Sequence, residues 1–359
     1  MAILHQIRGR GASYNPPNRF DQISFEPDDE WEDPDDPHPY RQTHYHRDHS
    51  RTVIARNESP DVSFNASVNP FRGCANGCIY CFARPSHEFF GLSAGLDFET
   101  RIFVKEDAPE LLRQALANPR WVPEVIGMSG VTDCYQPVER KLQLTRRCLE
   151  VLAEFRNPVT IITKNHLVTR DIDLLSEMAA WNGATVNISI TSLDEKLQRV
   201  MEPRASTPRR RLDAVEKLAK AGVRVRVLAA PMIPGLNDHE LASIIMASAK
   251  AGAQAAAYIP VRLPYVVKEL FERWLETNFP ERKEKVLHRI REMRGGKLND
   301  PNFGSRMRGE GEYANQLAVL FLAACRKAGL KGEDLPPLST DHFRRPHDSR
   351  GQLGLFEAV

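Results

Sequence analysis

The sequence lacks any long apolar run. Its 359 residues contain no stretch of about 18 consecutive apolar residues, the length that a transmembrane helix requires. The amino terminus, MAILHQIRGRGASYNPPNRF, also lacks the apolar core of a secretory signal peptide. The formal charge of only +2 neither supports nor excludes a nucleic-acid partner, which requires a clustered basic face. We therefore expect a cytoplasmic protein with no membrane association.

Cysteine is scarce as well. The chain has six cysteines, and three of them fall within eight residues, which is unlike the spacing of a disulfide framework. We expect free thiols and a reducing compartment. With 42% hydrophobic residues, the chain is long enough to bury one large core.

The grouped cysteines, Cys74, Cys78 and Cys81, have the spacing C-x3-C-x2-C. Gly73 and Gly77 allow the backbone to fold tightly around a small inorganic group. A structural zinc site is closed by four Cys or His ligands, and no second cysteine pair follows downstream. Since iron–sulfur cubanes are normally held by four thiolates, three predict a cluster with one open, catalytic iron. Three buried thiols and a partial zinc site are the alternatives.

The stretch NPFRGCANGCIYCFARPSHEFFGLSAGLDFETRIFVK, with Tyr80 just before the third cysteine, resembles the signature of the radical S-adenosylmethionine (SAM) superfamily. More narrowly, it resembles the spore photoproduct lyase-like branch, from about Ser59 to about Leu330. The resemblance implies that the three cysteines hold a [4Fe-4S] cluster whose fourth iron binds SAM. One electron would then cleave SAM to methionine and a 5′-deoxyadenosyl radical that abstracts hydrogen from a substrate. Tyr80 counts among the cofactor-binding residues on the same basis.

From Val62 onward, short apolar runs alternate with amphipathic helical patterns. Later strands are expected to begin near residues 124, 159, 184, 223 and 253, and each step fits one βα unit. Such a series predicts an α/β fold with a parallel sheet and helical crossovers. The resemblance implies an incomplete TIM-like (β/α)6 barrel.

The ends of the chain differ in composition from its middle. Eight of the eleven positions from Glu26 to Asp36 are acidic, which predicts a disordered tail over residues 1–60. We expect the partial barrel over 61–264, a helical C-terminal extension over 265–330 and a flexible tail over 331–359.

Functional residues of such barrels lie at the carboxyl ends of the strands. Thr132 and Asp133 follow the second core strand, where a carboxylate suits an ammonium group. The alternative is a turn whose Asp133 caps a helix that starts at Glu139. The resemblance implies that Thr132 and Asp133 contact the amino end of SAM.

Lys164 leaves the end of the next apolar strand, and its fixed charge suits a carboxylate. The resemblance implies that it binds the methionine carboxylate of SAM, whereas a solvated lysine is the alternative. Arg204 lies in an EPR triplet typical of the branch, which favours cofactor binding over solvation.

The fourth core strand carries polar side chains. Strand alternation places Asn187, Ser189 and Thr191 on one face, where hydroxyl groups suit ribose oxygens. Ser189 matches the ribose contact of the family.

Outside the grouped cysteines, only Cys134 falls at a strand end, since Cys148 and Cys325 have the spacing of core residues. In spore photoproduct lyases a thiol near this loop returns a hydrogen atom to the product radical, and it lies just before the Thr-Ser-Asp stretch. Here Gly130 has that position. Cys134 is therefore either a catalytic hydrogen donor or a packing residue beneath the loop, and the departure argues against thymine-dimer reversal.

The sequence thus predicts a radical SAM enzyme with one cluster, an unidentified substrate that includes nucleic acid among its candidates, and a flavodoxin- or ferredoxin-type electron donor. The absence of a second cysteine cluster disfavours branches with auxiliary clusters. Two alternatives stay open: a non-catalytic iron–sulfur protein that binds nucleic acid, and a radical SAM enzyme acting on a peptide, tRNA or small molecule.

Overall fold

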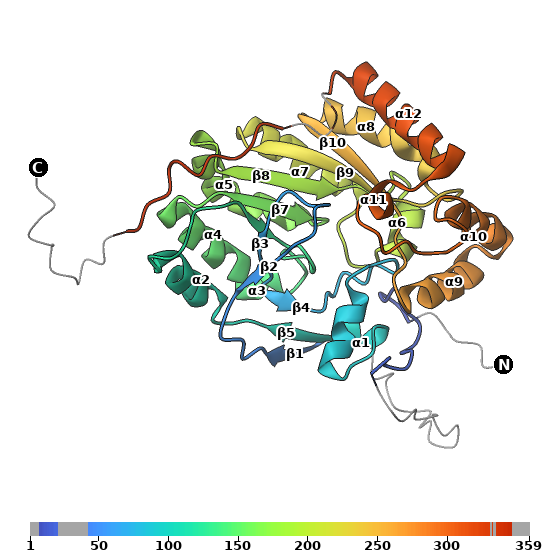
Figure 1. Ribbon diagram of the computed structural model, residues 1–359, viewed down its shortest axis with the longest axis horizontal. Coiled ribbons are helices and arrows are strands. Elements are labelled where there is room, and N and C mark those ends of the chain that lie inside the picture. The colour runs from blue at the N-terminus through green and yellow to red at the C-terminus, as the bar shows by residue number, and fades with distance from the viewer. Residues whose placement is uncertain (1–6, 21–41, 331, 333–334, 347–359) are drawn as a thin grey trace, which may run out of the picture.

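A seven-stranded sheet forms the centre of the molecule, as the computed structural model shows (Figure 1). The structure describes residues 7–20, 42–330, 332 and 335–346. The strand order is β10-β9-β8-β7-β6-β3-β2, and all neighbours are parallel except β2, which runs antiparallel to β3. The strands are β2 (Ile54–Arg56), β3 (Ala66–Val68), β6 (Ile126–Met128), β7 (Val159–Thr163), β8 (Ala184–Ser189), β9 (Arg224–Met232) and β10 (Ala255–Pro260).

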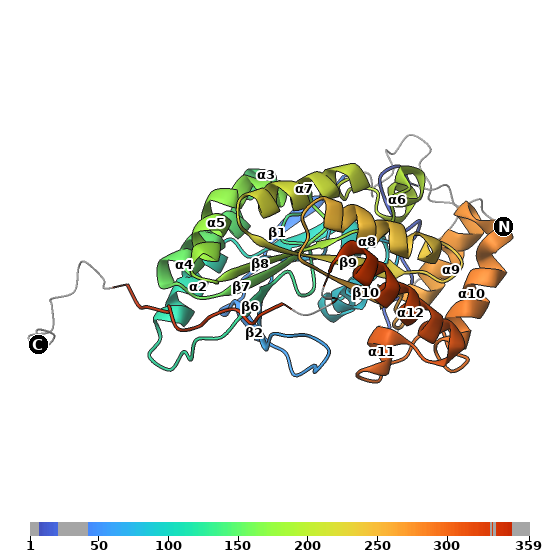
Figure 2. The same cartoon turned by 90° about the horizontal axis from the view of Figure 1, so that it is seen from above.

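Helices cover one face of this sheet (Figure 2). They are α2 (Ala108–Ala117), α4 (Leu144–Phe155), α5 (Ile172–Ala180), α7 (Pro208–Lys220) and α8 (Leu241–Lys250). Alternate positions of β9, such as Val225 and Val227, are fully buried against them. Each such side chain contributes about 1.5–3 kcal/mol through its burial.

The other face of the sheet is polar. Asn187 donates a hydrogen bond to the hydroxyl of Thr160 (2.9 Å) and accepts one from Arg226 (2.7 Å) across neighbouring strands. An open parallel sheet with helices on one face and polar side chains on the other is an incomplete barrel. The predicted α/β fold class is therefore confirmed.

A smaller sheet faces the main one from the lower part of Figure 1. It has the order β1-β5-β4, formed by β1 (His44–Arg47), β5 (Arg101–Val104) and β4 (Phe71–Arg72). The short helix α1 (Leu96–Thr100) leads directly into β5.

The predicted disordered tail over 1–60 does not hold for its described parts. Arg10 is 1% exposed, because its guanidinium donates to the carbonyl oxygen of Glu99 (3.0 Å). His44–Arg47 pairs with β5, and Ile54–Arg56 pairs with β3. Long-range contacts that composition does not reveal order these segments, and residues 1–6 and 21–41 lie outside the described residues.

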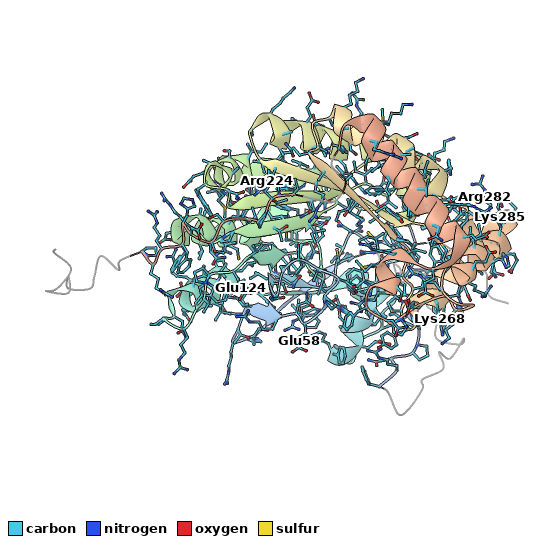
Figure 3. The ribbon with its side chains drawn as sticks, turned by 45° about the horizontal axis from the view of Figure 1, so that its top comes forward. Glu58, Glu124, Arg224, Lys268, Arg282 and Lys285 are labelled. Atoms are coloured by element: carbon cyan, nitrogen blue, oxygen red, sulfur yellow. The ribbon has the colours of Figure 1, made fainter. Side chains whose placement is uncertain are left out.

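The region after β10 is helical, as predicted. It contains α9 (Val267–Asn278), α10 (Lys283–Glu292), α11 (Ser305–Arg308) and α12 (Gly311–Ala328), and α12 packs beside α8. Figure 3 places Lys268, Arg282 and Lys285 on the same side of the molecule, where α9 and α10 lie. Within the described residues, no helix combines the length and the apolar character needed to cross a membrane.

The flexible tail predicted for 331–359 does not hold for its described portion either. The Phe343 ring lies 6.3 Å from the Phe155 ring, and the backbone N–H of Arg344 donates to the Phe155 carbonyl oxygen (2.9 Å). Residues 335–346 are thus held against the end of α4. Residues 331, 333–334 and 347–359 lie outside the described residues.

Short elements fill the loops at the edge of the sheet. They are α3 (Glu139–Leu142), α6 (Glu195–Met201) and the 3-10 helices η2 (Arg84–Phe90), η3 (His166–Asp171), η4 (Asp238–Glu240) and η5 (Pro280–Arg282). Gln143, in the left-handed region at φ 52°, separates α3 from α4.

Candidate functional site

The three grouped cysteines lie in the loop after β3, at the carboxyl edge of the parallel strands. Cys74 and Cys78 are buried, Cys81 is partly exposed, and none of the three forms a disulfide. No group of three or more His, Cys, Asp or Glu side chains in the described part of the chain is arranged to hold a metal ion. A cubane does not require such convergence, because its thiolates bind different irons.

Two glycines bend this cysteine loop, which we define as residues 73–81. Gly73 and Gly77 have φ values of 78° and 68°, in the left-handed region that favours glycine. A Cβ atom at Gly77 would come within 2.8 Å of the Glu99 carboxylate, and one at Gly73 would come within 2.9 Å of the Phe98 carbonyl oxygen. The path of the loop therefore requires both glycines.

Gln136, which is fully buried, holds the loop from the segment after β6. Its side-chain oxygen accepts a hydrogen bond from the N–H of Ala75 (3.0 Å), and its amide nitrogen donates to the carbonyl oxygen of Gly73 (3.3 Å). Sequence reasoning did not find Gln136, because no spacing marks it as a partner of a loop some 60 residues earlier.

A buried ion pair supports the other side of the loop. Arg84 donates to the carbonyl oxygen of Cys78 (3.0 Å) and pairs with Glu99, and both side chains are fully buried. Glu99 also accepts hydrogen bonds from the backbone N–H groups of Gly11 (3.0 Å) and Ala12 (2.8 Å). The amino-terminal segment is thereby fastened to the cysteine loop.

The three thiols suit a cluster whose iron ions supply the positive charge that thiolates need in a buried site. Burial raises the pKa of Cys74 to about 12, and burial also raises the pKa values of Cys78 and Cys81. Since thiolates, not thiols, bind metal, iron must supply the charge that keeps them deprotonated. Three free thiols in one tight loop are the donor set for a cubane with one open iron.

Asp133 connects the cysteine loop to the end of β7. Its two carboxylate oxygens accept five hydrogen bonds, which occupy the roughly four lone-pair positions of an ionised carboxylate. The donors are the side chains of Asn76 (3.0 Å), Thr163 (2.7 Å) and Asn165 (2.9 Å) and the backbone N–H groups of Tyr135 (2.9 Å) and Lys164 (2.9 Å).

The alternative that Asp133 caps the Glu139 helix is wrong, because the N-cap of α3 is Val138 and has no side-chain cap. Thr132 is 3% exposed, and its hydroxyl donates to the carbonyl oxygen of Phe71 (2.8 Å). Thr132 and Asp133 thus shape the loops around the cysteines.

Lys164 and Ser189 lie where the adjacent strands β7 and β8 end. The Lys164 ammonium lies 5.9 Å from the centre of the Tyr80 ring, so it faces the cysteine loop. Ser189 is 3% exposed and pairs in register with Leu228 of β9. The fold thus brings Tyr80, Lys164 and Ser189 to one edge of the sheet.

Tyr80 is anchored by a buried carboxylate. Its hydroxyl donates to Glu202, which also accepts from Thr191 (2.5 Å) and pairs with Arg211. Burial opposes ionisation of Glu202, but Arg211 and Lys164 outweigh it and lower the Glu202 pKa. Sequence reasoning missed this network: within the EPR triplet it favoured Arg204, whereas the side chain that reaches the cysteine loop is that of Glu202.

Arg204 points elsewhere. Its guanidinium donates to the carbonyl oxygen of Gly9 (3.0 Å) and to the hydroxyl of Thr43 (3.3 Å). Its backbone N–H donates to the carbonyl oxygen of Asn76 (3.3 Å). The Arg204 side chain therefore holds the amino-terminal segment, which composition alone predicted to be disordered.

Cys134 lies beneath the loop and not at the mouth. It is 0% exposed and belongs to the core between sheet and helices. Its backbone N–H donates to the Ser129 hydroxyl (2.8 Å), and its carbonyl oxygen accepts from Thr145 (2.7 Å). Burial raises the pKa of its thiol well above the usual value. Of the two alternatives for Cys134, the packing residue beneath the loop fits this burial, and the catalytic hydrogen donor does not.

Comparison with known proteins decides the family. The profile of the Radical SAM superfamily matches residues 68–246. An uncharacterized protein of Mycobacterium tuberculosis is 32% identical over 260 residues, which cover 71% of this chain and 75% of that protein. The chain belongs to the radical SAM superfamily. This radical SAM chain is also 28% identical over 217 residues to an uncharacterized protein of Methanocaldococcus jannaschii, covering 60% of this chain and 77% of the relative.

Solved structures agree on the fold. Spore photoproduct lyase complexed with dinucleoside spore photoproduct has a TM-score of 0.57 at 16% identity, with 80% of each chain covered. A double mutant of that lyase with bound AdoMet and the same dinucleoside gives the same values. This radical SAM enzyme uses the cofactors of its superfamily, a [4Fe-4S] cluster and SAM.

Proposed function

We propose that Cys74, Cys78 and Cys81 hold the cluster of this enzyme. The observation that carries the proposal is their position: three unbridged thiols share one glycine-bent loop at the carboxyl edge of the sheet. When bound, the cluster would pass one electron from an external reductant to SAM, the chemistry that gives methionine and a 5′-deoxyadenosyl radical able to abstract hydrogen. The side chains of Gln136, Arg84 and Asn76 fix the loop that carries the thiols.

The proposed SAM site is the edge where β7 and β8 end. Lys164 binds the methionine carboxylate, because its ammonium faces the cysteine loop. Ser189 contacts the ribose, and Tyr80, fixed by Glu202, forms the wall beside Lys164. Thr132 and Asp133 act on the amino end of SAM by positioning the surrounding backbone. Arg204 has no part in this site.

We propose nucleic acid as the substrate class. The Arg19 guanidinium lies 4.7 Å from the Phe20 ring centre, 5.5 Å from Phe89 and 4.0 Å from Tyr265, and Phe89 and Tyr265 are 70% and 64% exposed. Exposed aromatic rings interleaved with arginine are the surfaces on which unpaired bases stack. Phe89 lies in the last turn of η2 (Arg84–Phe90), which begins shortly after Cys81. The lyase with the same fold is complexed with a dinucleoside.

The test is anaerobic reconstitution with iron, sulfide, SAM and dithionite, followed by measurement of 5′-deoxyadenosine with and without DNA. Irradiated and unirradiated DNA and single-stranded RNA are separate arms. We expect 5′-deoxyadenosine in all arms and faster formation with one class of nucleic acid. SAM cleavage that no nucleic acid alters would favour a peptide or small-molecule substrate. Nucleic-acid binding without SAM cleavage would favour a non-catalytic protein.

A further inference from the structure

A cavity of about 300 Å³ lies between the segments that follow β6, β7 and β8. Three arginines line it: Arg140 from α3, Arg204 from the loop after α6, and Arg210 from α7. Ser206 and Thr207 contribute hydroxyl groups to the wall. No Asp or Glu is among the lining residues, so the cavity is basic.

The three guanidinium groups have no acidic partner in the described part of the chain. Arg204 donates only to neutral oxygens, those of Gly9 and Thr43. Arg210 donates to the Nδ1 atom of His166 (3.3 Å), whose Nε2 atom is bonded to Asp213 (2.5 Å). Nε2 therefore carries the ring proton, and Nδ1 accepts the hydrogen bond from Arg210.

Neighbouring arginines behave differently. Arg146 pairs with Asp171 (3.1 Å) and Arg170 pairs with Glu139 (2.8 Å), while Arg211 pairs with Glu202 inside the core. These three arginines thus have carboxylate partners, whereas those that line the cavity have no counter-charge among the described residues. Such a local departure from charge pairing is typical of a functional site.

The first turn of α7 adds to the positive field. Arg209 and Arg210 lie at the start of this 13-residue helix, and its first turn contains no acidic residue. The amino end of a helix carries partial positive charge, so arginines there are unfavourable unless an anion lies nearby. The start of α7 therefore adds positive charge to a cavity that Arg140 and Arg204 already make basic.

We propose that this cavity, the arginine pocket, binds a phosphate group. The planar guanidinium fork matches phosphate oxygens, and three such groups match the charge of phosphate better than that of a single carboxylate. The Ser206 hydroxyl accepts a hydrogen bond from the backbone N–H of His166 (2.8 Å), so its own proton is free for a phosphate oxygen. A volume of about 300 Å³ exceeds phosphate alone and suits a phosphate that belongs to a larger ligand.

The arginine pocket adjoins the cysteine loop without belonging to the proposed SAM site. Asn165 lines the pocket and donates to both Asn76 (3.2 Å) and Asp133 (2.9 Å). A phosphate bound here would sit beside the supports of the cysteine loop. The inference does not rest on SAM cleavage, because phosphate binding requires no turnover.

Binding of inorganic phosphate to the anaerobically reconstituted enzyme, measured by isothermal titration calorimetry against a chloride background, tests the proposal. Wild-type enzyme should bind phosphate. Arg140→Ala and Arg210→Ala should each weaken binding about tenfold, because each removes a charge-assisted partner. Arg209→Ala is the matched control: it removes the same charge from the same helix turn but lies outside the pocket lining. It should change binding less than twofold.

Absence of phosphate binding by the wild type would overturn the proposal. So would equal weakening by Arg209→Ala and Arg210→Ala, which would indicate a diffuse basic surface. Iron content and circular dichroism establish that each variant is folded. Competition with a single-stranded oligonucleotide carrying a 5′-phosphate, and with a mononucleotide, then distinguishes a nucleic-acid phosphate from that of a small ligand.

Discussion

Gly11 lies directly against the carbonyl oxygen of Gly77, so that a Cβ atom added at Gly11 would come within 1.8 Å of that oxygen. Gly77 stands between Cys74 and Cys78, and Ile7, Ala12 and Cys78 share one hydrophobic cluster. The amino-terminal segment therefore covers the cysteine loop, and Glu99 fixes that cover through the N–H groups of Gly11 and Ala12.

Gly11→Ala should displace this cover, because a Cβ atom only 1.8 Å from the Gly77 carbonyl oxygen overlaps it, and one of the two backbones must move. We expect cluster absorbance to decay several-fold faster than in the wild type after exposure to air. Gly329→Ala is the control for backbone strain away from this contact: Gly329 has a left-handed φ of 72° at the end of α12, but a Cβ there meets nothing within 4 Å. Equal decay rates in Gly11→Ala and wild type would show that the segment does not shield the cluster.

Substitutions of Lys164 and Asp133 should have different effects on SAM binding and iron content. Lys164→Ala removes a charge-assisted contact and should weaken SAM binding by roughly 1.5–3 kcal/mol, with iron content unchanged. Asp133→Ala removes the acceptor for Asn76 and Asn165 and should lower iron content as well. Iron analysis and SAM equilibrium dialysis measure both. Unaltered SAM affinity in Lys164→Ala would move the SAM site elsewhere.

The cysteine spacing and the starts of the later strands were readable from the sequence because each depends on neighbours along the chain. The spacing C-x3-C-x2-C and the alternation of polar side chains in β8 can each be recognised from residues that lie close together in the sequence. The contacts that hold the cysteine loop do not: Gln136 meets Ala75, and Glu99 meets Gly11, across 61 and 88 residues. Those partners are set by tertiary packing, so Arg204 received a role that its surroundings do not support, and for Cys134 only the packing alternative fits.

The Glu202–Arg211 pair should be important for stability. Glu202→Gln leaves the Arg211 charge buried without its partner, which costs about 3–5 kcal/mol of unfolding free energy. Glu216→Gln is the matched control: its pair with Lys220 is exposed, and such pairs contribute roughly 0–1 kcal/mol. Urea denaturation measures both. A loss below about 1 kcal/mol in Glu202→Gln would contradict the predicted role.

The Glu202–Arg211 pair also predicts how the stability of the fold changes with pH. Because the Glu202 pKa is lowered in the folded protein, its contribution is complete above the ordinary glutamate pKa of about 4.3. It is lost as the pH falls through the folded pKa. Wild-type stability should therefore fall more steeply than that of Glu202→Gln on acidification below about pH 4.3. Parallel curves would indicate that Glu202 is not ionised in the fold.

Cys134→Ala should retain the cluster and 5′-deoxyadenosine formation, because its thiol is buried in the core. We also expect little lyase activity of the wild type on irradiated DNA, since this buried thiol is not placed to donate hydrogen to a product radical. Chromatography of digested DNA measures the reaction. Efficient conversion of spore photoproduct to thymines by the wild type, lost in Cys134→Ala, would make Cys134 the donor.

Formation of 5′-deoxyadenosine by single-cysteine variants tests the central claim most directly. After anaerobic reconstitution, the wild type should carry about four irons per chain and produce 5′-deoxyadenosine from SAM and dithionite. Cys74→Ala, Cys78→Ala and Cys81→Ala should each abolish both, whereas Cys148→Ala and Cys325→Ala, altered in the hydrophobic core, should retain both. Retention of cluster and SAM cleavage by any of the first three, or their loss in Cys325→Ala, would contradict the assignment.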